Sequence, residues 1–339
     1  MSLTRKRRNT GKVTLADVAQ LAGVGTMTVS RALRTPEQVS DKLREKIEAA
    51  VQELGYVPNL AASALASASS WTIGMVVPSL SEAGCSEMFA GLQQVLQPAG
   101  YQIMLAESRH HLEQEEKLLE TLLASNIAAA ILLSVEHSDT VRQWLKNSAI
   151  PVIEIGARRA DPLDMNIGID NAAAMYELTR MLIQRGYQNI GLLCANQEQW
   201  IFQQYLQGWY KAMLRHHMSP DRVINAAEPP TFSTGAAQLP EFLLAWPELD
   251  ALVCVSDELA CGALYECQRR RIKVPEDIAV VGFGDSDVSR VCQPPLTTIA
   301  VPHRQIGIEA GRALLARLNG EDRDSEAAIA ASLCLRDSC

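Results

Sequence analysis

The sequence lacks any run of about 18 apolar residues, the length that a membrane-spanning helix requires. Its apolar segment IAAAILLS, at 127–134, is far shorter and predicts a buried strand. The basic first residues are also not followed by the apolar segment of a secretory signal. We therefore expect a cytoplasmic protein without a membrane-spanning helix.

Cysteine patterns typical of metal sites are also absent. The eight cysteines form no C-x-x-C pair and have no neighbouring histidine ligands. Cys254, Cys261 and Cys267 are seven and six residues apart, spacings that fit no common zinc site. The adjacent histidine pairs, at 110–111 and 216–217, cannot share one helix face. We predict reduced, buried thiols, no metal and no cofactor.

Common enzyme motifs are missing too. The chain contains no G-x-x-x-x-G-K-[ST], H-E-x-x-H or G-x-S-x-G sequence. GFGDSD, at 282–287, is similar to a phosphate- or metal-binding loop, but its acidic residues would repel phosphate. An ordinary strand-to-helix turn is the commoner explanation, and the six histidines form no recognisable triad. We predict that the protein is not an enzyme.

Charge is distributed unevenly along the chain. Residues 1–60 carry ten Lys and Arg against six Asp and Glu, whereas the remainder carries 21 against 33. Because an acidic body repels nucleic acid, any contact with phosphate must come from the N-terminal segment. The cluster RKRR, at 5–8, indicates by itself only a solvated arm, which we assign to residues 1–12.

Two short amphipathic helices follow this arm. Thr14 and Asp17 have the spacing of a capping box and predict a helix over 15–21. Gly23 permits a sharp turn, and the next apolar pattern predicts a second helix over 26–33. This is the pattern of a helix-turn-helix, whose second helix lies in the major groove of DNA.

A third helix is predicted after Ser40, which would cap it. Apolar residues recur at helical spacing between Leu43 and Leu54, and Gly55 and Pro58 then stop the helix. The three helices would share one small core. A three-helix module without a role in DNA binding is the alternative interpretation.

The segments VTLADVAQLAGVGTMTVSRAL and VSDKLREKIEAAVQELGYVPN resemble the DNA-binding headpiece of the lactose-repressor/galactose-repressor family. The resemblance assigns residues 13–58 to a helix-turn-helix domain that reads operator bases with Thr26, Met27 and Arg31. Arginine can bond both O6 and N7 of guanine, and methionine offers apolar contact to a thymine methyl group. Contacts to phosphate would set the register of the complex. The predicted DNA-binding residues are Thr14, Thr26, Met27, Thr28, Ser30, Arg31, Asn59 and Leu65.

Residues 59–70, NLAASALASASS, form a linker. The segment has low complexity, which favours a flexible tether, but its many alanines favour a helix. A helix this short is marginal alone in water, so DNA and a twin segment would have to stabilise it. In the resembled family this segment is a hinge helix whose leucine, here Leu65, enters the minor groove.

From residue 71 onward, short apolar strands alternate with helical segments, and the pattern restarts after Asn171. Buried strands with helical crossovers predict two doubly wound parallel sheets, whose ligands bind at the carboxyl ends of the strands. The segments SDELACGALYECQRRRIKVPEDIAVVGFGDSD and PPLTTIAVP resemble the family's effector-binding core, which is akin to periplasmic sugar-binding proteins. The resemblance implies a first subdomain of about 71–171 and 303–323, and a second of about 172–302 and 324–339.

The chain most resembles the family branch that regulates gluconate and idonate use, through TPEQVS, AGYQIMLAES, ALYECQRRRIKVP and GFGDSD. Members that bind neutral sugars often have an arginine at the position of Tyr205 and an aspartate at that of Gly284. Without a carboxylate at 284, an anionic ligand meets less repulsion, so we predict a sugar-acid effector such as L-idonate, 5-ketogluconate or gluconate. The predicted effector-binding residues are Ser134, His137, Asp170, Tyr205, Asp257, Gly284 and Asp285, with Arg158, Arg159 and Arg290 as further candidates for the counter-charge.

Several alternatives remain open at this point. Asp170 and Asp257 are equally typical of ligand-binding residues and of helix caps. A transport-type sugar-binding protein would share the core fold, and a neutral sugar or a purine could replace the sugar acid. The favoured hypothesis is a homodimeric regulator on pseudo-palindromic operator DNA, acting as a repressor, an activator or both.

Overall fold

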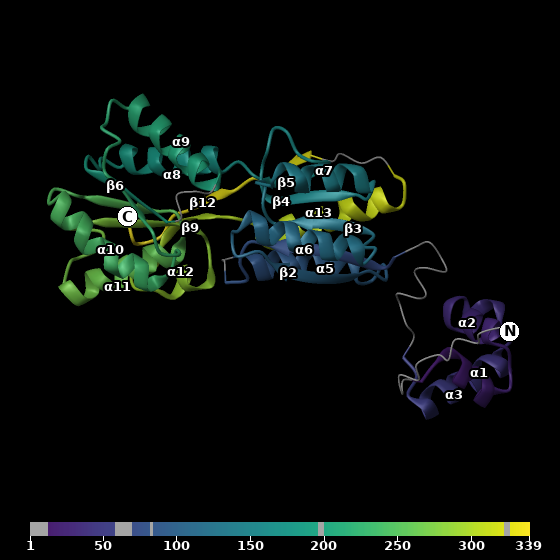
Figure 1. The fold of residues 1–339 in the computed structure, drawn as a ribbon. Helices are drawn as coiled ribbons and strands as arrows, with labels where there is room; N and C mark the ends of the chain where they lie inside the picture. Colours follow the sequence, from purple (N-terminus) through teal and green to yellow (C-terminus); the bar gives the residue numbers. More distant parts are fainter. Residues whose placement is uncertain (1–12, 58–69, 82–83, 196–199, 322–325) are drawn as a thin grey trace. The chain divides into compact units, whose positions relative to one another are not determined.

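A computed structural model describes residues 13–57, 70–81, 84–195, 200–321 and 326–339 of the chain. The protein divides into two compact units, Met1–Ser70 and Trp71–Cys339 (Figure 1). The predicted residues Asn59 and Leu65, the arm at 1–12 and nearly all of the linker lie outside the described residues.

The N-terminal unit consists of α1 (Leu15–Ala22), α2 (Thr26–Arg34), the short 3-10 helix η1 (Pro36–Gln38) and α3 (Asp41–Leu54). The predicted capping box is confirmed: Asp17 Oδ2 accepts the N–H of Thr14 at 2.7 Å, and the Thr14 hydroxyl accepts that of Asp17 at 3.4 Å. Gly23 and Gly55 both adopt the left-handed conformation, with φ of 62° and 60°. The turn between α1 and α2 and the end of α3 therefore lie where the sequence places them.

One small core joins the three helices. Val18 and Ala19 of α1, Val29 of α2, and Ile47 and Ala50 of α3 are buried together. The small Ala19 side chain lies in this core and is only 4% exposed. The helix-turn-helix is thus a packed module in its own right.

The second unit, Trp71–Cys339, is the core unit, and it contains two sheets. In the first sheet, which has six strands, every pair of neighbouring strands is parallel. Its strand order is β11-β5-β4-β3-β1-β2. The helices of this subdomain are α5 (Cys85–Leu96), α6 (Leu112–Ala124), α7 (Asp139–Ser148) and α13 (His303–Leu318). The strands are β1 (Thr72–Val77), β2 (Gln102–Glu107), β3 (Ala129–Leu132), β4 (Val152–Ala157), β5 (Met165–Ile169) and β11 (Glu326–Ala328).

The second sheet has the order β12-β10-β9-β8-β6-β7, in which only the pair β10 and β12 is antiparallel among the described strands. The predicted parallel, doubly wound architecture is therefore confirmed with one antiparallel edge strand. The strands are β6 (Ile190–Ala195), β7 (Val223–Ala226), β8 (Ala251–Cys254), β9 (Ala279–Gly284), β10 (Thr297–Ala300) and β12 (Ser332–Cys334). The helices are α8 (Asn171–Gln184), α9 (Trp200–Arg215), α10 (Phe232–Ala245), α11 (Asp257–Arg270) and α12 (Asp287–Val291).

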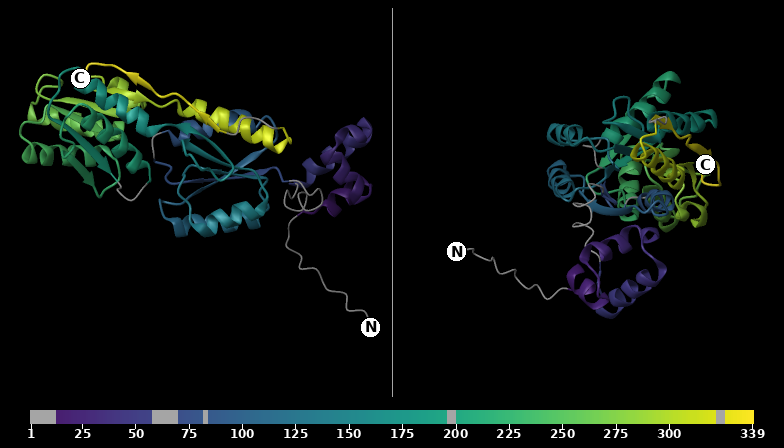
Figure 2. Two further views of the ribbon diagram at one scale, coloured as in Figure 1. Left: turned by 90° about the horizontal axis from the view of Figure 1, so that it is seen from above. Right: turned by 90° about the vertical axis from the view of Figure 1, so that its right-hand side faces the viewer.

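The chain passes between the two sheets three times: from β5 to α8, from β10 to α13, and from β11 to β12. Figures 1 and 2 both show the yellow α13 beside the blue and teal strands of the first subdomain, although it follows the second subdomain in sequence. One predicted boundary needs correction. Residues 324–339 were assigned to the second subdomain, but β11 pairs in parallel with β5 of the first sheet.

Close packing of α13 on α5 requires glycine on both helices. A Cβ atom at Gly91 would lie 2.2 Å from the carbonyl oxygen of Arg304, and one at Gly307 would lie 2.1 Å from that of Met88. Both distances are impossible for a real side chain. These glycines thus allow the backbone that returns from the second subdomain to contact the first directly.

The thiols and helices agree with a chain that lacks disulfides and membrane-spanning helices in its described part. All eight cysteines lie within the described residues and none forms a disulfide; all but Cys334 and Cys339 are buried. No helix in the described part of the chain combines the length and apolar character that a membrane span requires. Within the same residues, no group of His, Cys, Asp or Glu is arranged to hold a metal ion.

Candidate DNA-binding and effector sites

The outer face of α2 carries the predicted base-reading residues. Thr26, Met27 and Arg31 are exposed, and the Met27 side chain is 74% exposed. Val29 and Ala32, on the opposite face, are buried against the other helices. Helical spacing thus separates the face that packs from the face that is available to a ligand.

The remaining predicted DNA-binding residues divide into two groups. Thr28 and Ser30 are partly exposed on α2. Thr14 is exposed at the start of α1, but its side chain already participates in the capping box. The N-cap residue of α2 is Gly25, which makes no side-chain capping bond. Backbone N–H groups at this helix start suit an acceptor such as phosphate oxygen.

In the core unit, the loop after β3 carries two predicted effector residues. The Ser134 hydroxyl accepts the N–H of Glu136 at 3.2 Å, so it stabilises the loop itself. His137 is buried, with Nδ1 3.0 Å from both carboxylate oxygens of Glu115 and Nε2 3.3 Å from Oε1 of Glu154. Burial lowers the pKa of His137, but hydrogen bonds and charges from Glu115 and Glu154 outweigh this effect and raise it to about 9. His137 is therefore already paired inside the first subdomain and is not exposed to an effector.

The two arginines after β4 differ in their surroundings. Arg159 donates through Nη1 to the carbonyl oxygen of Val135, and its backbone N–H donates to Asn166 Oδ1 at 2.8 Å. Arg158 is exposed, and its backbone N–H donates to the carbonyl oxygen of Ile169 at 2.8 Å. Within the described residues, the Arg158 guanidinium has neither a hydrogen-bond nor an ion-pair partner. Of the two, Arg158 is therefore the free cation.

In the second subdomain, Asp257 is fully buried at the start of α11. Its Oδ1 accepts the hydroxyl of Thr298 at 2.6 Å, and its Oδ2 accepts the backbone N–H of Ser286 at 2.6 Å. The capping bond of α11 comes from Ser256, so Asp257 is not its N-cap. Burial raises the pKa of Asp257, against the hydrogen bonds that lower it. The carboxylate thus links the start of α11 to the start of α12 and to β10, and it does not extend into solvent.

In the GFGDSD segment, Gly284 has no side chain and the neighbouring Asp285 is paired with two arginines. Gly284 has φ of 138°, a conformation that side chains disfavour. Asp285 Oδ1 pairs with Arg336 at 2.5 Å and its Oδ2 pairs with Arg290 at 2.9 Å. Burial opposes ionisation of Asp285, but the bonds from Arg336 and Arg290 outweigh it and hold its pKa below the usual value. Arg290 is therefore a partner of Asp285, not a free counter-charge.

The last two predicted effector residues lie just before α8 and on α9. Asp170 is the N-cap of α8, where its Oδ1 accepts the N–H of Ala173 at 2.8 Å. Asp170 remains exposed. Tyr205 is half-buried on α9, and its ring packs edge-on against Phe283 at 5.1 Å between centroids.

Sequence reasoning missed several residues that organise these edges. Glu115, Glu154 and Arg336 each neutralise a predicted site residue, and Glu136 accepts the N–H of Trp200 at 2.7 Å. The partners of these pairs are 17 to 64 positions apart in the sequence. His137 and Glu154 are the nearest, and Glu136 and Trp200 are the farthest apart. No local motif signals contacts over such distances.

Comparisons with known proteins agree with this architecture. Residues 14–59 match the model of bacterial regulatory proteins of the lacI family, and residues 179–339 match a periplasmic binding protein-like domain. The chain is 38% identical to the HTH-type transcriptional regulator GntR of Escherichia coli strain K12 over 91% of this chain and 92% of that protein. It is 31% identical to the HTH-type transcriptional regulator IdnR of the same strain, over 92% and 94% of the two chains.

A solved structure extends the likeness to both units. A transcriptional regulator of the LacI family from Silicibacter pomeroyi has a TM-score of 0.90, with 28% identity over 96% of this chain and 99% of that one. The comparison therefore covers the helix-turn-helix as well as the two sheets. With its lacI-type headpiece, its two-sheet core and these relatives, the chain belongs to the LacI family of ligand-responsive, DNA-binding transcriptional regulators and is not an enzyme.

Proposed function

We propose that this regulator controls genes of sugar-acid catabolism in the cytoplasm and responds to an effector of the L-idonate, 5-ketogluconate or gluconate type. The observation that carries the proposal is the balance of charge at the predicted effector edge. Asp285 is paired with two arginines, Asp257 is buried among hydroxyl and amide donors, and position 284 has no side chain. Arg158 is left exposed and unpaired among the described residues. Such an edge favours an anion over a neutral sugar.

The relatives support the same effector class. Identity of 38% to GntR and 31% to IdnR is consistent with the gluconate and idonate branch that the sequence motifs indicate. In this proposal Arg158 binds the effector carboxylate, and Asp170 and Tyr205 lie at its polyhydroxyl part. Ser134, Asp257, Gly284 and Asp285 would shape the site mainly through the loops that they hold.

Calorimetry with the full-length protein tests this proposal. Gluconate, L-idonate and 5-ketogluconate should bind more tightly than a neutral aldose of the same length. Arg158→Ala should weaken the sugar acids at least about tenfold, because a charge-assisted hydrogen bond is lost. Arg215→Ala, at the exposed end of α9, is the matched control. Tighter binding of the neutral aldose, or equal effects of the two variants, would contradict the proposal.

For DNA we propose that α2 lies in the major groove, with Arg31 on guanine, Met27 on a thymine methyl group, and Thr26 beside them. Thr28, Ser30 and Asn59 would hold phosphates, and Leu65 would enter the minor groove. Arg31→Ala should cost about 1–3 kcal/mol of operator binding and relax specificity at one base pair. Footprinting with and without sugar acids would locate the operator and show whether the effector releases it.

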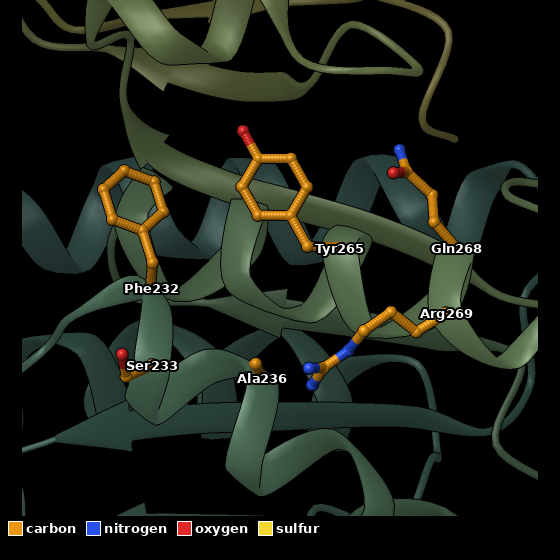
Figure 3. Close-up of a pocket in the computed structure, with 6 residues that line it drawn as sticks. All are labelled: Phe232, Ser233, Ala236, Tyr265, Gln268 and Arg269. Atoms are coloured by element: carbon orange, nitrogen blue, oxygen red, sulfur yellow. The ribbon is translucent and has the colours of Figure 1, made fainter.

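We also propose that two copies associate through α10 and α11. Figure 3 shows Phe232 of α10 and Tyr265 of α11 beside the same surface depression, which Ala236, Gln268 and Arg269 also line. The two rings lie 6.4 Å apart between centroids, and their side chains are 42% and 41% exposed. Exposed aromatic pairs are typical of protein interfaces. Tyr265→Glu should therefore shift sedimentation from dimer to monomer, whereas Tyr210→Glu on α9 should not.

A further inference from the structure

A carboxylate of the first subdomain contacts a residue of the second, and neither residue belongs to the three connecting segments. Glu136 lies in the loop between β3 and α7, and its Oε2 accepts the backbone N–H of Trp200 at 2.7 Å. Trp200 is the first residue of α9, which packs on α8 and β6 of the second subdomain. The bond joins residues that are 64 positions apart and belong to subdomains built on different sheets.

This contact has the features of a strong hydrogen bond. The N–H groups in the first turn of a helix lack intrahelical partners and carry the positive end of the helix dipole. A carboxylate is the acceptor that this end favours, and its charge strengthens the bond relative to a neutral acceptor. Glu136 is only partly exposed, so solvent screens the contact incompletely.

Several contacts hold the loop that carries Glu136 to the first subdomain. On one side, Val135 O accepts from Arg159, and the Ser134 hydroxyl accepts the N–H of Glu136 itself. On the other side, the Ser138 hydroxyl donates to Glu116 at 2.5 Å, and His137 is enclosed by two buried carboxylates. Because residues on both sides of Glu136 are fixed to their own subdomain, its carboxylate can remain in place when the second subdomain moves.

We propose that Glu136 is a latch between the two subdomains, which holds α9 against the carboxyl edge of the first sheet. The proposal deepens the proposed function: it rests on an effector of the proposed class, and it adds that this effector binds with the two subdomains closed on each other. The latch supplies part of the free energy of closure before any effector binds. The buried contacts of His137 with Glu115 and Glu154 hold the neighbouring Glu136 in position.

Hydrogen exchange in the full-length protein without effector tests the latch directly. Glu136→Ala should accelerate exchange of the Trp200 amide at least about tenfold, because the amide loses a charge-assisted acceptor. Glu136→Gln keeps an oxygen acceptor without charge and should give an intermediate rate. Glu116→Ala is the matched control, because it removes an anchor of the same loop but no contact to α9.

The outcomes separate the latch from general loosening of the loop. Acceleration in Glu136→Ala but not in Glu116→Ala supports the proposal. An unchanged rate in Glu136→Ala, or equal acceleration in both variants, would overturn it. Unfolding by urea shows whether each variant is folded under the conditions of exchange, and Glu136→Gln provides a milder change if Glu136→Ala is not.

Binding of gluconate and L-idonate provides a second measurement. Glu136→Ala should weaken whichever sugar acid binds the wild-type protein by about fivefold to tenfold, because the effector must then supply the whole free energy of closure. An unchanged affinity contradicts the coupling. If the wild-type protein binds no sugar acid, the proposed effector class fails, whereas the exchange experiment still decides whether the latch exists.

Discussion

The carboxyl edges of the two sheets neutralise their ionic groups in opposite ways. At the first sheet a buried cation, His137, is enclosed by two carboxylates whose side chains are 5% exposed or less. At the second sheet, Asp257 is surrounded by neutral donors, and Asp285 by two arginines that are partly exposed. The first arrangement depends on charge pairing without solvent, whereas in the second the two arginines of Asp285 are in contact with water. We therefore expect the first edge to be the more sensitive to mutation.

The largest effect should follow from removal of the buried cation. His137→Leu leaves Glu115 and Glu154 without their partner, and breaking a buried ion pair in this way typically costs about 3–5 kcal/mol. Urea denaturation followed by circular dichroism measures the loss. The variant with His137→Leu, Glu115→Gln and Glu154→Gln removes the stranded charges and should be more stable than His137→Leu alone. A loss below about 1 kcal/mol in the single variant would refute the buried pairing.

The same cluster predicts a pH dependence of stability. The pKa of His137 is raised from 6.5 to about 9, so the folded protein retains a proton that the unfolded chain releases between these values. The contribution of this proton is complete below pH 6.5 and lost as the pH rises through 9. The linked change is about 1.4 kcal/mol for each pKa unit.

Comparison with His137→Gln isolates this contribution. The hydrogen bond with Cys261 lowers the pKa of Cys292, and this group therefore adds stability as the pH rises. Both proteins contain this opposing group. The difference in unfolding free energy between wild type and His137→Gln should decrease steadily from pH 6.5 to 9. A constant difference would show that His137 is not charged in the folded protein.

At the second edge the expected loss is smaller. Asp257→Asn keeps the volume of the side chain but replaces one acceptor oxygen with an NH2 donor, which then faces another donor. We expect this to cost about 1–3 kcal/mol of stability. Asp170→Asn is the control, since an exposed N-cap tolerates asparagine nearly as well as aspartate. Thermal unfolding of both variants provides the measurement. An equal loss at the two positions would show that burial of Asp257 has little effect on its energetic role.

Local sequence patterns accounted for most of the fold. The capping box at Thr14, the glycine turns at Gly23 and Gly55, and the alternation of strands and helices all depend on residues near one another in the chain. These features are therefore visible without a structure. The exception at β11 has a physical reason: three residues form too short a segment to reveal which sheet they join.

The candidate effector site was less accessible to sequence reasoning. His137 and Arg290 were predicted as counter-charges because histidine and arginine in loops are typical of anion sites. The structure shows both already paired, by Glu115 and Glu154 in one case and by Asp285 in the other. Whether a charged side chain is free depends on groups that only the folded chain brings together. Arg158 differs from them in having no such group among the described residues.

The smallest effects should distinguish the two arginines of Asp285. The Arg290 side chain is 60% exposed and makes one contact with the carboxylate, so Arg290→Ala should change stability by about 0–1 kcal/mol. Arg336 is 19% exposed and also donates to the carbonyl oxygen of Leu296 at 2.7 Å, so Arg336→Ala should cost more. Urea denaturation at low and at high salt distinguishes the two variants, because salt strongly screens only the exposed Arg290–Asp285 pair. Equal losses, or a loss in Arg336→Ala that high salt abolishes, would show that the second edge is no more protected from solvent than the molecular surface.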